Sequence, residues 1–239
     1  MPNRTLLPGV KALTFDVFGT VVDWRASIIH EATALELPVD PAKFADEWRA
    51  GYQPAMARVR TGELGWTSID VLHRQILDGL LAKHKIGGLT EARKDYLNRV
   101  WHRLDPWPDA ARGLALLRRT FICATLSNGN VSLLVDLARH GGLTWDCVLS
   151  AEIYRAYKPD AKVYLGAAQT LGMKPEEVMM VAAHKNDLLA ARKAGLKTAF
   201  VERPLEKGPG GTADRGREDW MDVYAKDFVD LAAQFGPGV

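Results

Sequence analysis

The sequence has few of the features that would assign a protein to a specialised class. Its 239 residues include only two cysteines, Cys123 and Cys147, and their spacing fits neither a CxxC redox pair nor a zinc site. No apolar run approaches the ~18 residues that a membrane span needs. The 31 Lys and Arg nearly balance the 29 Asp and Glu, so the net charge is only +2. These properties argue against a disulfide scaffold, and against a membrane or nucleic acid as a partner.

The remaining composition is that of an ordinary globular protein. Apolar residues make up 47% of the chain and charged residues 25%, which suits a sizeable buried core. The apolar stretch in residues 1–10 is interrupted by Pro8 and Gly9, so it lacks the continuous core of a secretory signal. Because both cysteines lie in apolar segments, nothing indicates an oxidising compartment. We expect a cytoplasmic protein, with small neutral or anionic ligands remaining open.

Short apolar runs alternate with longer amphipathic segments in the second half of the chain, as in the βαβ units of a parallel sheet. The predicted strands are residues 10–15, 121–126, 147–149, 178–182 and 198–201. The predicted helices are residues 109–119, 131–140, 161–171, 188–194 and 227–235, with an exposed loop over 203–219. Since the strands are mostly apolar throughout, we expect them to be buried on both faces, in a doubly wound α/β fold.

Residues 23–104 do not show this alternation of strands and helices, because they contain no convincing strand. They show instead four helical periods, at residues 26–35, 41–60, 67–83 and 90–103. The chain then returns through Asp-Pro-Trp-Pro-Asp at residues 105–109, which is too stiff for a helix. The pattern predicts a helical cap domain over residues 23–104, inserted into a core domain of residues 1–22 and 105–239.

Polar side chains gather where the predicted strands end. Asp16 follows the first strand and Ser127-Asn128 ends the second. Lys158 lies in a later turn, and residues 184–187 follow the strand at 178–182. In an open α/β sheet the ligand crevice lies beyond the carboxyl ends of the strands. We therefore expect these four segments to meet in one site.

At these segments the sequence resembles the haloacid dehalogenase superfamily, and within it the L-2-haloacid dehalogenases, over nearly the whole chain. The resemblance rests on FDVFGT at 15–20, LSNG at 126–129, YKPDAKVY at 157–164, VAAHKNDLLAARKAGLKTAFVERP at 181–204, and Trp48-Arg49 in the cap. It implies a Rossmann-like core with a helical cap. It also implies a hydrolase that displaces halide from a 2-haloalkanoic acid through an aspartyl ester, with neither metal nor organic cofactor.

Asp16 is the candidate nucleophile. A buried carboxylate stays ionised only beside a cation or several donors, and Lys158 is the natural counter-ion. Removed from water, such a carboxylate is a better nucleophile toward carbon. Thr20 is close enough in sequence to donate to it. The alternative is that Asp16 is a helix N-cap or a loop carboxylate.

Phe18 separates two branches of the superfamily. Phosphatase relatives carry an acid two residues after the nucleophile to protonate the leaving alcohol, and a phenyl ring transfers no proton. They typically carry a further aspartate where Ala183 stands, which helps to hold Mg²⁺. Both departures favour carbon over phosphorus as the electrophile, so a Mg²⁺-dependent phosphatase is the lesser alternative and no metal site is expected.

The substrate acid needs a cation and hydrogen-bond donors. Arg49 matches the family residue that meets the substrate carboxylate or the departing halide; the alternative is a solvated arginine on a helix face. Ser127 and Asn128 precede a helix start, which suits holding a carboxylate or simply capping the helix. Arg49 is a candidate catalytic residue, and Ser127, Asn128 and Phe18 are candidates for substrate binding.

Hydrolysis of the ester needs an oriented water, and Asp187 with Lys158 are the candidates to orient or deprotonate it. The closest dehalogenases place Asn, in a Ser-Ser-Asn series, where this chain has His184. A histidine there has four options: to donate to Asp187, to act as the base, to contact the leaving group, or to be a satisfied histidine beside the pocket. The sequence alone does not choose among them.

The walls of the pocket decide the substrate. Tyr164 and Trp66 are the aromatic candidates, and Asn186 stands where the nearest relatives have Trp. Relatives of this kind release fluoride from fluoroacetate or open the ring of azetidine-2-carboxylate, so these 2-substituted acids are alternatives to a short haloacid. A silent protein that binds small acids is a third alternative. The resemblance also allows a homodimer built through the exposed cap helices.

Overall fold

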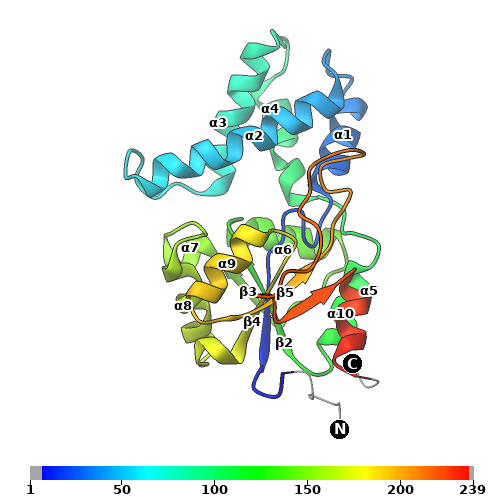
Figure 1. Cartoon of the computed structure of the whole chain (residues 1–239). Helices are drawn as coiled ribbons and strands as arrows, with labels where there is room; N and C mark the ends of the chain where they lie inside the picture. Colours follow the sequence, from blue (N-terminus) through cyan, green and yellow to red (C-terminus); the bar gives the residue numbers. More distant parts are fainter. Residues whose placement is uncertain (1–6, 237–239) are drawn as a thin grey trace.

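The computed structural model describes residues 7–236, and its centre is one parallel sheet (Figure 1). The strand order is β3-β2-β1-β4-β5-β6, and every neighbouring pair is parallel. The strands are β1 (Ala12–Phe15), β2 (Ile122–Ser127), β3 (Cys147–Ser150), β4 (Val178–Ala182), β5 (Lys197–Val201) and β6 (Val223–Ala225). The five predicted strands are present, and β6 is an edge strand that the sequence analysis did not predict.

Helices cover both faces of the sheet, which confirms the doubly wound α/β class. Figure 1 shows α8 and α9 on one face and α5 and α10 on the other. The core helices are α5 (Ala110–Leu117), α6 (Val131–His140), α7 (Ala151–Tyr154), α8 (Ala161–Thr170), the 3₁₀ turn η2 (Pro175–Glu177), α9 (Lys185–Lys193) and α10 (Phe228–Gln234). Strands β1 and β4 are buried along their whole length, because they are central and covered on both sides.

The predicted helical insertion lies above the carboxyl ends of the strands (Figure 1). Its elements are α1 (Trp24–Ala34), α2 (Pro41–Arg60), α3 (Ile69–Lys83), α4 (Glu91–Asn98) and the 3₁₀ helix η1 (Arg99–His102). The last predicted helix, 90–103, is therefore two elements. Asp23, Asp40 and Thr90 each accept a hydrogen bond from a backbone N–H of the first helical turn, which explains where α1, α2 and α4 begin.

The cap is anchored to the core at both of its ends. The N–H of Asp23 donates to the carbonyl of Asp105 (2.8 Å), so the exit and return of the chain lie side by side. Farther along, His102 of η1 contacts Asp70 of α3 (3.0 Å) and Asp136 of α6 (2.8 Å). The two-domain division at these points stays a prediction, and residues 1–6 and 237–239 of the predicted core domain lie outside the described residues.

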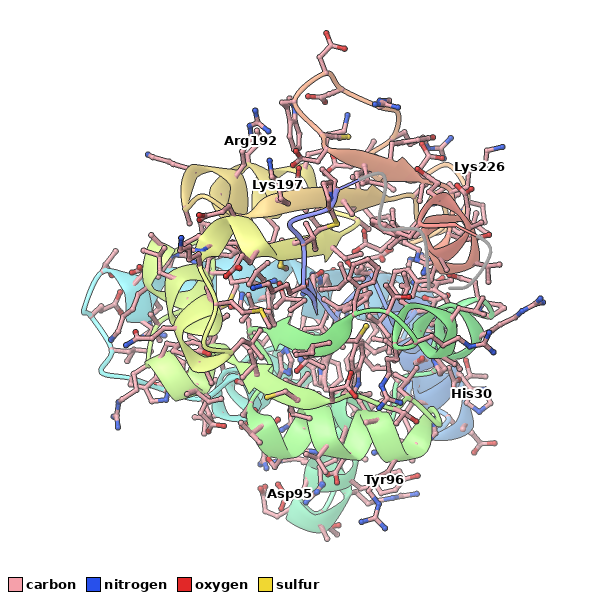
Figure 2. All side chains as sticks on the ribbon, turned by 90° about the horizontal axis from the view of Figure 1, so that it is seen from below. His30, Asp95, Tyr96, Arg192, Lys197 and Lys226 are labelled. Atoms are coloured by element: carbon pink, nitrogen blue, oxygen red, sulfur yellow. The ribbon has the colours of Figure 1, made fainter. Side chains whose placement is uncertain are left out.

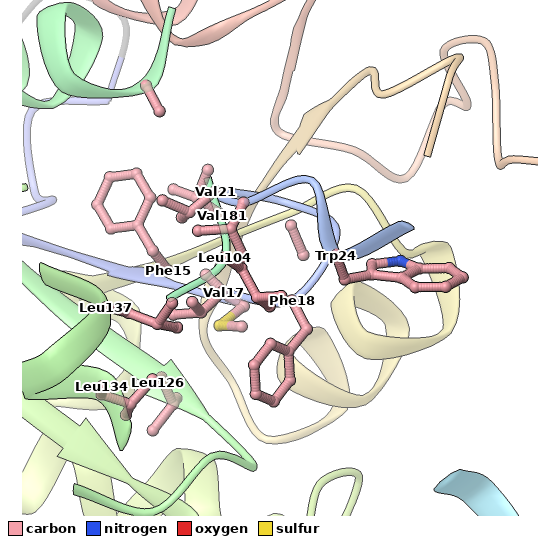
Figure 3. Close-up of a cluster of buried hydrophobic side chains, with 14 of the residues drawn as sticks. Phe15, Val17, Phe18, Val21, Trp24, Leu104, Leu126, Leu134, Leu137 and Val181 are labelled. Atoms are coloured by element: carbon pink, nitrogen blue, oxygen red, sulfur yellow. The ribbon is translucent and has the colours of Figure 1, made fainter. Parts of the chain in front are cut away.

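Apolar side chains from the sheet and the flanking helices fill the space between the layers. The ring of Phe15 lies 5.3 Å from those of Trp145 and Phe228. Figure 3 shows Phe15, Val17, Leu126, Leu137 and Val181 in one buried cluster. Charged side chains such as Arg192, Lys197 and Lys226 project outward (Figure 2). No helix within residues 7–236 is both long and apolar enough to cross a membrane.

Two boundaries differ from prediction in a way that affects the site. Helix α9 begins at Lys185 rather than residue 188, which puts Asp187 in its first turn and His184 just before it. The loop predicted to be exposed over 203–219 is not exposed throughout, because Arg203 (5%) and Glu206 (2%) are buried. The prediction was wrong there since Gly and charged residues in the segment were taken to mean full solvation.

Candidate active site

Asp16 lies directly after β1 and accepts three side-chain hydrogen bonds. Lys158 Nζ donates to Oδ1 (2.9 Å), and Thr20 Oγ1 donates to Oδ2 (2.8 Å). Nδ1 of His184 lies 3.1 Å from Oδ2. The hydroxyl of Thr20 also accepts from the N–H of Ala183 (2.9 Å), which fixes its proton toward Asp16. The structure thus brings three predicted residues together around the carboxylate of Asp16.

Lys158 joins Asp16 to a second carboxylate. Its ammonium donates to Asp187 Oδ2 at 2.6 Å, and Tyr164 Oη donates to the other oxygen, Oδ1, at 2.5 Å. The backbone N–H of Lys158 donates to Asn128 Oδ1 (2.8 Å), which ties the turn after β3 to the end of β2. The two carboxylates therefore share one buried cation.

This arrangement decides the charge of each group. Burial raises the pKa of Asp16, but the charges and hydrogen bonds of Lys158 and His184 outweigh it and hold that pKa well below its usual range. Burial alone would lower the pKa of Lys158, and the two carboxylates raise it instead. Asp16 is therefore an anion and Lys158 a cation at neutral pH.

His184 is held between two carboxylates. Its Nε2 lies 3.0 Å from Oε1 and 3.1 Å from Oε2 of Glu206, opposite the contact of Nδ1 with Asp16. Burial lowers the pKa of His184, yet its bonds to Asp16 and Glu206 raise it to about 10. Of the options left open by the sequence, a contact with Asp187 is not the one found in this part of the structure.

Glu206 is a site residue that the sequence analysis missed. It comes from the loop between β5 and β6, which Figure 1 shows rising toward α1. Trp24 Nε1 donates to its Oε1 (3.1 Å). A Cβ on Gly19 would lie 2.3 Å from that oxygen, so a glycine is required at position 19. One signal was available: a buried histidine beside a nucleophile needs a second acceptor.

The loop that carries Glu206 is fastened to the core by Arg203. Its guanidinium binds both oxygens of Asp109, at 2.7 and 2.9 Å, and its Nε donates to the carbonyl of Thr20 (2.8 Å). A bidentate pair of this kind fixes orientation as well as charge. Arg203 thus holds the loop and the turn after Asp16 in register.

Asp16 opens into a cavity of about 300 Å³ between the core and the cap. From the core it is lined by Phe18, Asn128, Lys158, Asn186 and neighbouring residues, and from α2 by Arg49, Tyr52, Gln53 and Arg60. The α2 residues repeat at three- and four-residue spacing from Arg49, which is one face of a helix. This spacing would have identified them from the sequence.

Arg49 differs from the other cations of the site. Its Nη1 is buried and has no hydrogen-bond partner among the described residues. The guanidinium carbon lies 4.3 Å from the ring centre of Tyr52 and 5.5 Å from that of Trp24. The aromatic faces hold the guanidinium beside the cavity, which Arg49 lines, and leave the buried Nη1 without a hydrogen-bond acceptor among the described residues.

Three predicted substrate-binding residues lie outside the cavity lining. Ser127 is fully buried at the end of β2 and accepts a hydrogen bond from the N–H of Gly129 (3.1 Å). Tyr164 lies behind Asp187, as described above. Trp66 packs against Tyr157, with ring centres 4.8 Å apart. Their geometry supports the walls of the site rather than direct contact with a ligand.

The described residues 7–236 contain no group of three or more His, Cys, Asp or Glu side chains arranged to hold a metal ion. A second hollow of about 880 Å³ shares Arg49, Tyr52 and His184 with the first cavity. It extends between α2 and the Glu206 loop, where Lys207 and Asp214 border it. We interpret it as the outer vestibule of the same site.

Comparisons with known proteins agree with this geometry. Residues 10–195 match the family of haloacid dehalogenase-like hydrolases. The chain is 30% identical to (S)-2-haloacid dehalogenase 4A of Burkholderia cepacia, over 83% of this chain and 85% of that protein.

Two solved structures are similar throughout. One, of a defluorinating L-2-haloacid dehalogenase, has a TM-score of 0.92 and 44% identity and covers 98% of this chain and 99% of that one. The other, of L-2-haloacid dehalogenase from Xanthobacter autotrophicus with chloropropionic acid covalently bound, has a TM-score of 0.78 and 25% identity, over 93% of this chain and 97% of that one. The chain therefore belongs to the haloacid dehalogenase-like hydrolases, and among them to the L-2-haloacid dehalogenase family.

Proposed function

We propose that this protein hydrolyses short 2-haloalkanoic acids, with Asp16 displacing the halide from C2 and water then hydrolysing the aspartyl ester. The observation that carries the proposal is an ionised, 7% exposed carboxylate that faces the same small cavity as Arg49, a cation with a free donor. The Burkholderia relative is a 2-haloacid dehalogenase by name, and the Xanthobacter enzyme is described with chloropropionic acid covalently bound. These similarities support the same chemistry here.

The hydrogen bonds indicate which oxygen of Asp16 attacks. Oδ2 accepts from both Thr20 and His184, so both of its lone pairs are engaged. Oδ1 accepts only from Lys158 and keeps one lone pair free. In the first step Oδ1 bonds to C2, the carbon–halogen bond breaks, and its electron pair leaves with the halide. Attack opposite the leaving group inverts the configuration at C2.

Arg49 is the group we assign to the anions of this step. Its guanidinium, which lines the cavity, receives the substrate carboxylate or the departing halide, while Phe18 offers an apolar wall to the carbon chain. Asn128 and Asn186 supply further polar contacts at the cavity wall. A cavity of about 300 Å³ suits acids of a few carbon atoms.

In the second step a water adds to the ester carbon Cγ of Asp16. Asp187 orients it and takes one of its protons, while Lys158 holds both carboxyl groups in place. The bond between Cγ and Oδ1 then breaks, and Oδ1 takes the proton held by Asp187 and leaves as the hydroxyl of the 2-hydroxy acid. The second proton of the water is released. The water oxygen becomes the new carboxylate oxygen, and the net products are hydroxy acid, halide and one proton.

The experiment measures halide release from 2-chloropropionate, chloroacetate and fluoroacetate, with azetidine-2-carboxylate opening followed in parallel. We expect turnover of at least the chlorinated acids, and none by Asp16→Asn. One turnover in H₂¹⁸O is expected to place label in the peptide that contains Asp16. No turnover of any acid in the panel, or an unlabelled peptide after turnover, would overturn the proposal.

A Mg²⁺-dependent phosphatase is tested in the same samples. It requires hydrolysis of aryl phosphates that EDTA abolishes, and we expect none, because Phe18 and Ala183 offer neither a proton nor a carboxylate oxygen.

A further inference from the structure

The His184–Glu206 pair is not needed for the displacement of halide. Yet His184, whose side chain is 23% exposed, contacts the nucleophile, and the buried Glu206 contacts its other ring nitrogen. We propose that His184 is a catalytic residue of ester hydrolysis, an imidazolium that stabilises the oxyanion formed on Oδ2, and that Glu206 is the positioning residue that keeps it charged. This inference rests on the proposed function and concerns its second step.

The contacts require both ring nitrogens of His184 to carry hydrogen. Nδ1 faces Asp16 Oδ2 and Nε2 faces both oxygens of Glu206, and ionised carboxylates only accept hydrogen bonds. Neither nitrogen is left with a lone pair directed at the cavity. A water base needs such a lone pair, so this geometry suits a donor of hydrogen bonds rather than a base.

Oδ2 is the oxygen on which negative charge develops. Once Oδ1 carries the ester, Oδ2 is the carbonyl oxygen, and water addition to Cγ moves the carbonyl electron pair onto it. Thr20 at 2.8 Å and His184 at 3.1 Å already point donors at that atom. Two fixed donors at the oxygen that becomes charged are what an oxyanion hole requires. Collapse of this intermediate uses that pair to re-form the Cγ–Oδ2 double bond and breaks the Cγ–Oδ1 bond.

Glu206 matters most after the ester has formed. In the free enzyme two carboxylates hold the proton of His184, but esterification removes the charge of Asp16. Lys158 and Arg49, which line the same cavity, favour the neutral ring, and so does burial. Glu206 is then the one contacting carboxylate that keeps the imidazolium charged. Its own pKa is raised by burial and lowered, on balance, by His184.

The surroundings of Glu206 are shaped for this role. Trp24 donates to one of its oxygens, and the absent side chain at Gly19 leaves the space that this oxygen occupies. Glu206 is 2% exposed although it comes from a surface loop. Burying a loop carboxylate costs desolvation energy. Such a carboxylate is therefore expected to have a charged partner that has a functional role.

The test is Glu206→Gln, which keeps the shape and the bond from Trp24 but removes the charge. Halide release in the first turnover and the rate of ester hydrolysis are measured separately by rapid quench at pH 5.5 and pH 8, with the ester on the Asp16 peptide followed by mass. Glu202→Gln, in the same loop and bonded to the N–H of Gly216, is the matched control.

We expect Glu206→Gln to give a full first-turnover burst of halide at both pH values. Ester hydrolysis is expected to slow about 10- to 100-fold at pH 8, the scale of a weakened oxyanion donor, and the ester to accumulate. At pH 5.5, where the ring is protonated without help, the rate returns to within about threefold of the wild type. Glu202→Gln stays close to wild type at both pH values.

Four results would overturn the inference. They are ester hydrolysis in Glu206→Gln that rises with pH, as a base would require; unchanged hydrolysis; loss of the burst; or a defect equal at both pH values. If Glu206→Gln fails to fold, His184→Gln carries the test, and normal ester hydrolysis in that variant contradicts the inference. Absence of any halide burst from the wild type would instead count against the proposed function itself.

Discussion

The core and cap sides of the cavity differ in whether their buried polar groups have hydrogen-bond partners. On the core side, Asp16, Lys158 and Asp187 are each held by two or more hydrogen bonds. On the cap side, Arg49 Nη1 has no partner in the described structure, and neither ring nitrogen of His73 has one. The three core-side groups are thus hydrogen-bonded without substrate, whereas Arg49 on the cap side has a donor without a partner in the described structure.

Two histidines show the same difference, His184 with a 23% exposed side chain and His73 fully buried. His184, between two carboxylates, has its pKa raised to about 10, whereas burial lowers the pKa of His73 to about 3. His73 stacks on Trp101, with ring centres 4.0 Å apart, and packs near Phe18 and Tyr52. Burial alone keeps an imidazole neutral, and only opposite charges reverse that. Changing one group on each side tests this difference between the core and the cap.

Lys158→Met is expected to have the largest effect. It leaves Asp16 and Asp187 buried without their shared cation, so the free energy of unfolding should fall by about 3–5 kcal/mol. Dehalogenation should fall at least ~10³-fold, because a protonated or mispositioned Asp16 no longer attacks carbon. Urea unfolding and halide release measure the two effects.

Lys162→Met, on the exposed side of α8, is the matched control and should change neither quantity. An unfolding free energy of Lys158→Met equal to that of the wild type would show that the core-side charges are not a mutually dependent set, and the comparison would fail on that side.

Arg49→Met removes the free cation on the cap side. We expect kcat/KM to fall about 10- to 100-fold, the scale of one hydrogen bond to a charged group, and product inhibition by bromide to weaken. The free energy of unfolding should change by less than about 1 kcal/mol, because only contacts with Tyr52 and Trp24 are lost. Arg58→Met, on the same helix and paired with exposed Glu63, is the control. A loss of stability as large as that of Lys158→Met would erase the distinction between the two sides.

The sequence predicted that the core-side residues would meet, because they follow strands in the chain. Asp16, Lys158 and Asp187 come at or near strand ends, and parallel strands bring such ends to one edge. Four of the five predicted strands, β1, β2, β4 and β5, are central, and they were recognisable because two-sided burial makes them mostly apolar. Edge strand β6 was missed, since three residues at the border of a sheet need no such pattern.

There is also a physical reason why the site residue in the loop was not predicted from the sequence. Glu206 lies in a segment with Gly and charge on both sides, and its burial depends on Trp24, Gly19 and His184, which are far away in the sequence. No local pattern reports contacts of that kind. The use of Ser127 and Tyr164 as supports rather than cavity lining likewise depends on side-chain direction, which strand and helix periods do not fix.

The smallest effect is expected for His73→Phe, which removes the unpartnered ring nitrogens. Because the pKa of His73 is lowered, the unfolded chain binds a proton at His73 below about pH 6.5, whereas the folded chain binds it only near pH 3. His73 therefore lowers the free energy of unfolding as the pH falls from about 6.5 to about 3. At pH 7 the variant should unfold within about 1 kcal/mol of the wild type. At pH 4.5 it should be the more stable by about 2 kcal/mol, whereas His30→Gln, an exposed histidine, should follow the wild type at both pH values. Urea unfolding at the two pH values measures these free energies of unfolding. An equal change with pH in His73→Phe and in the wild type would mean that His73 has a hydrogen-bond acceptor in the folded cap.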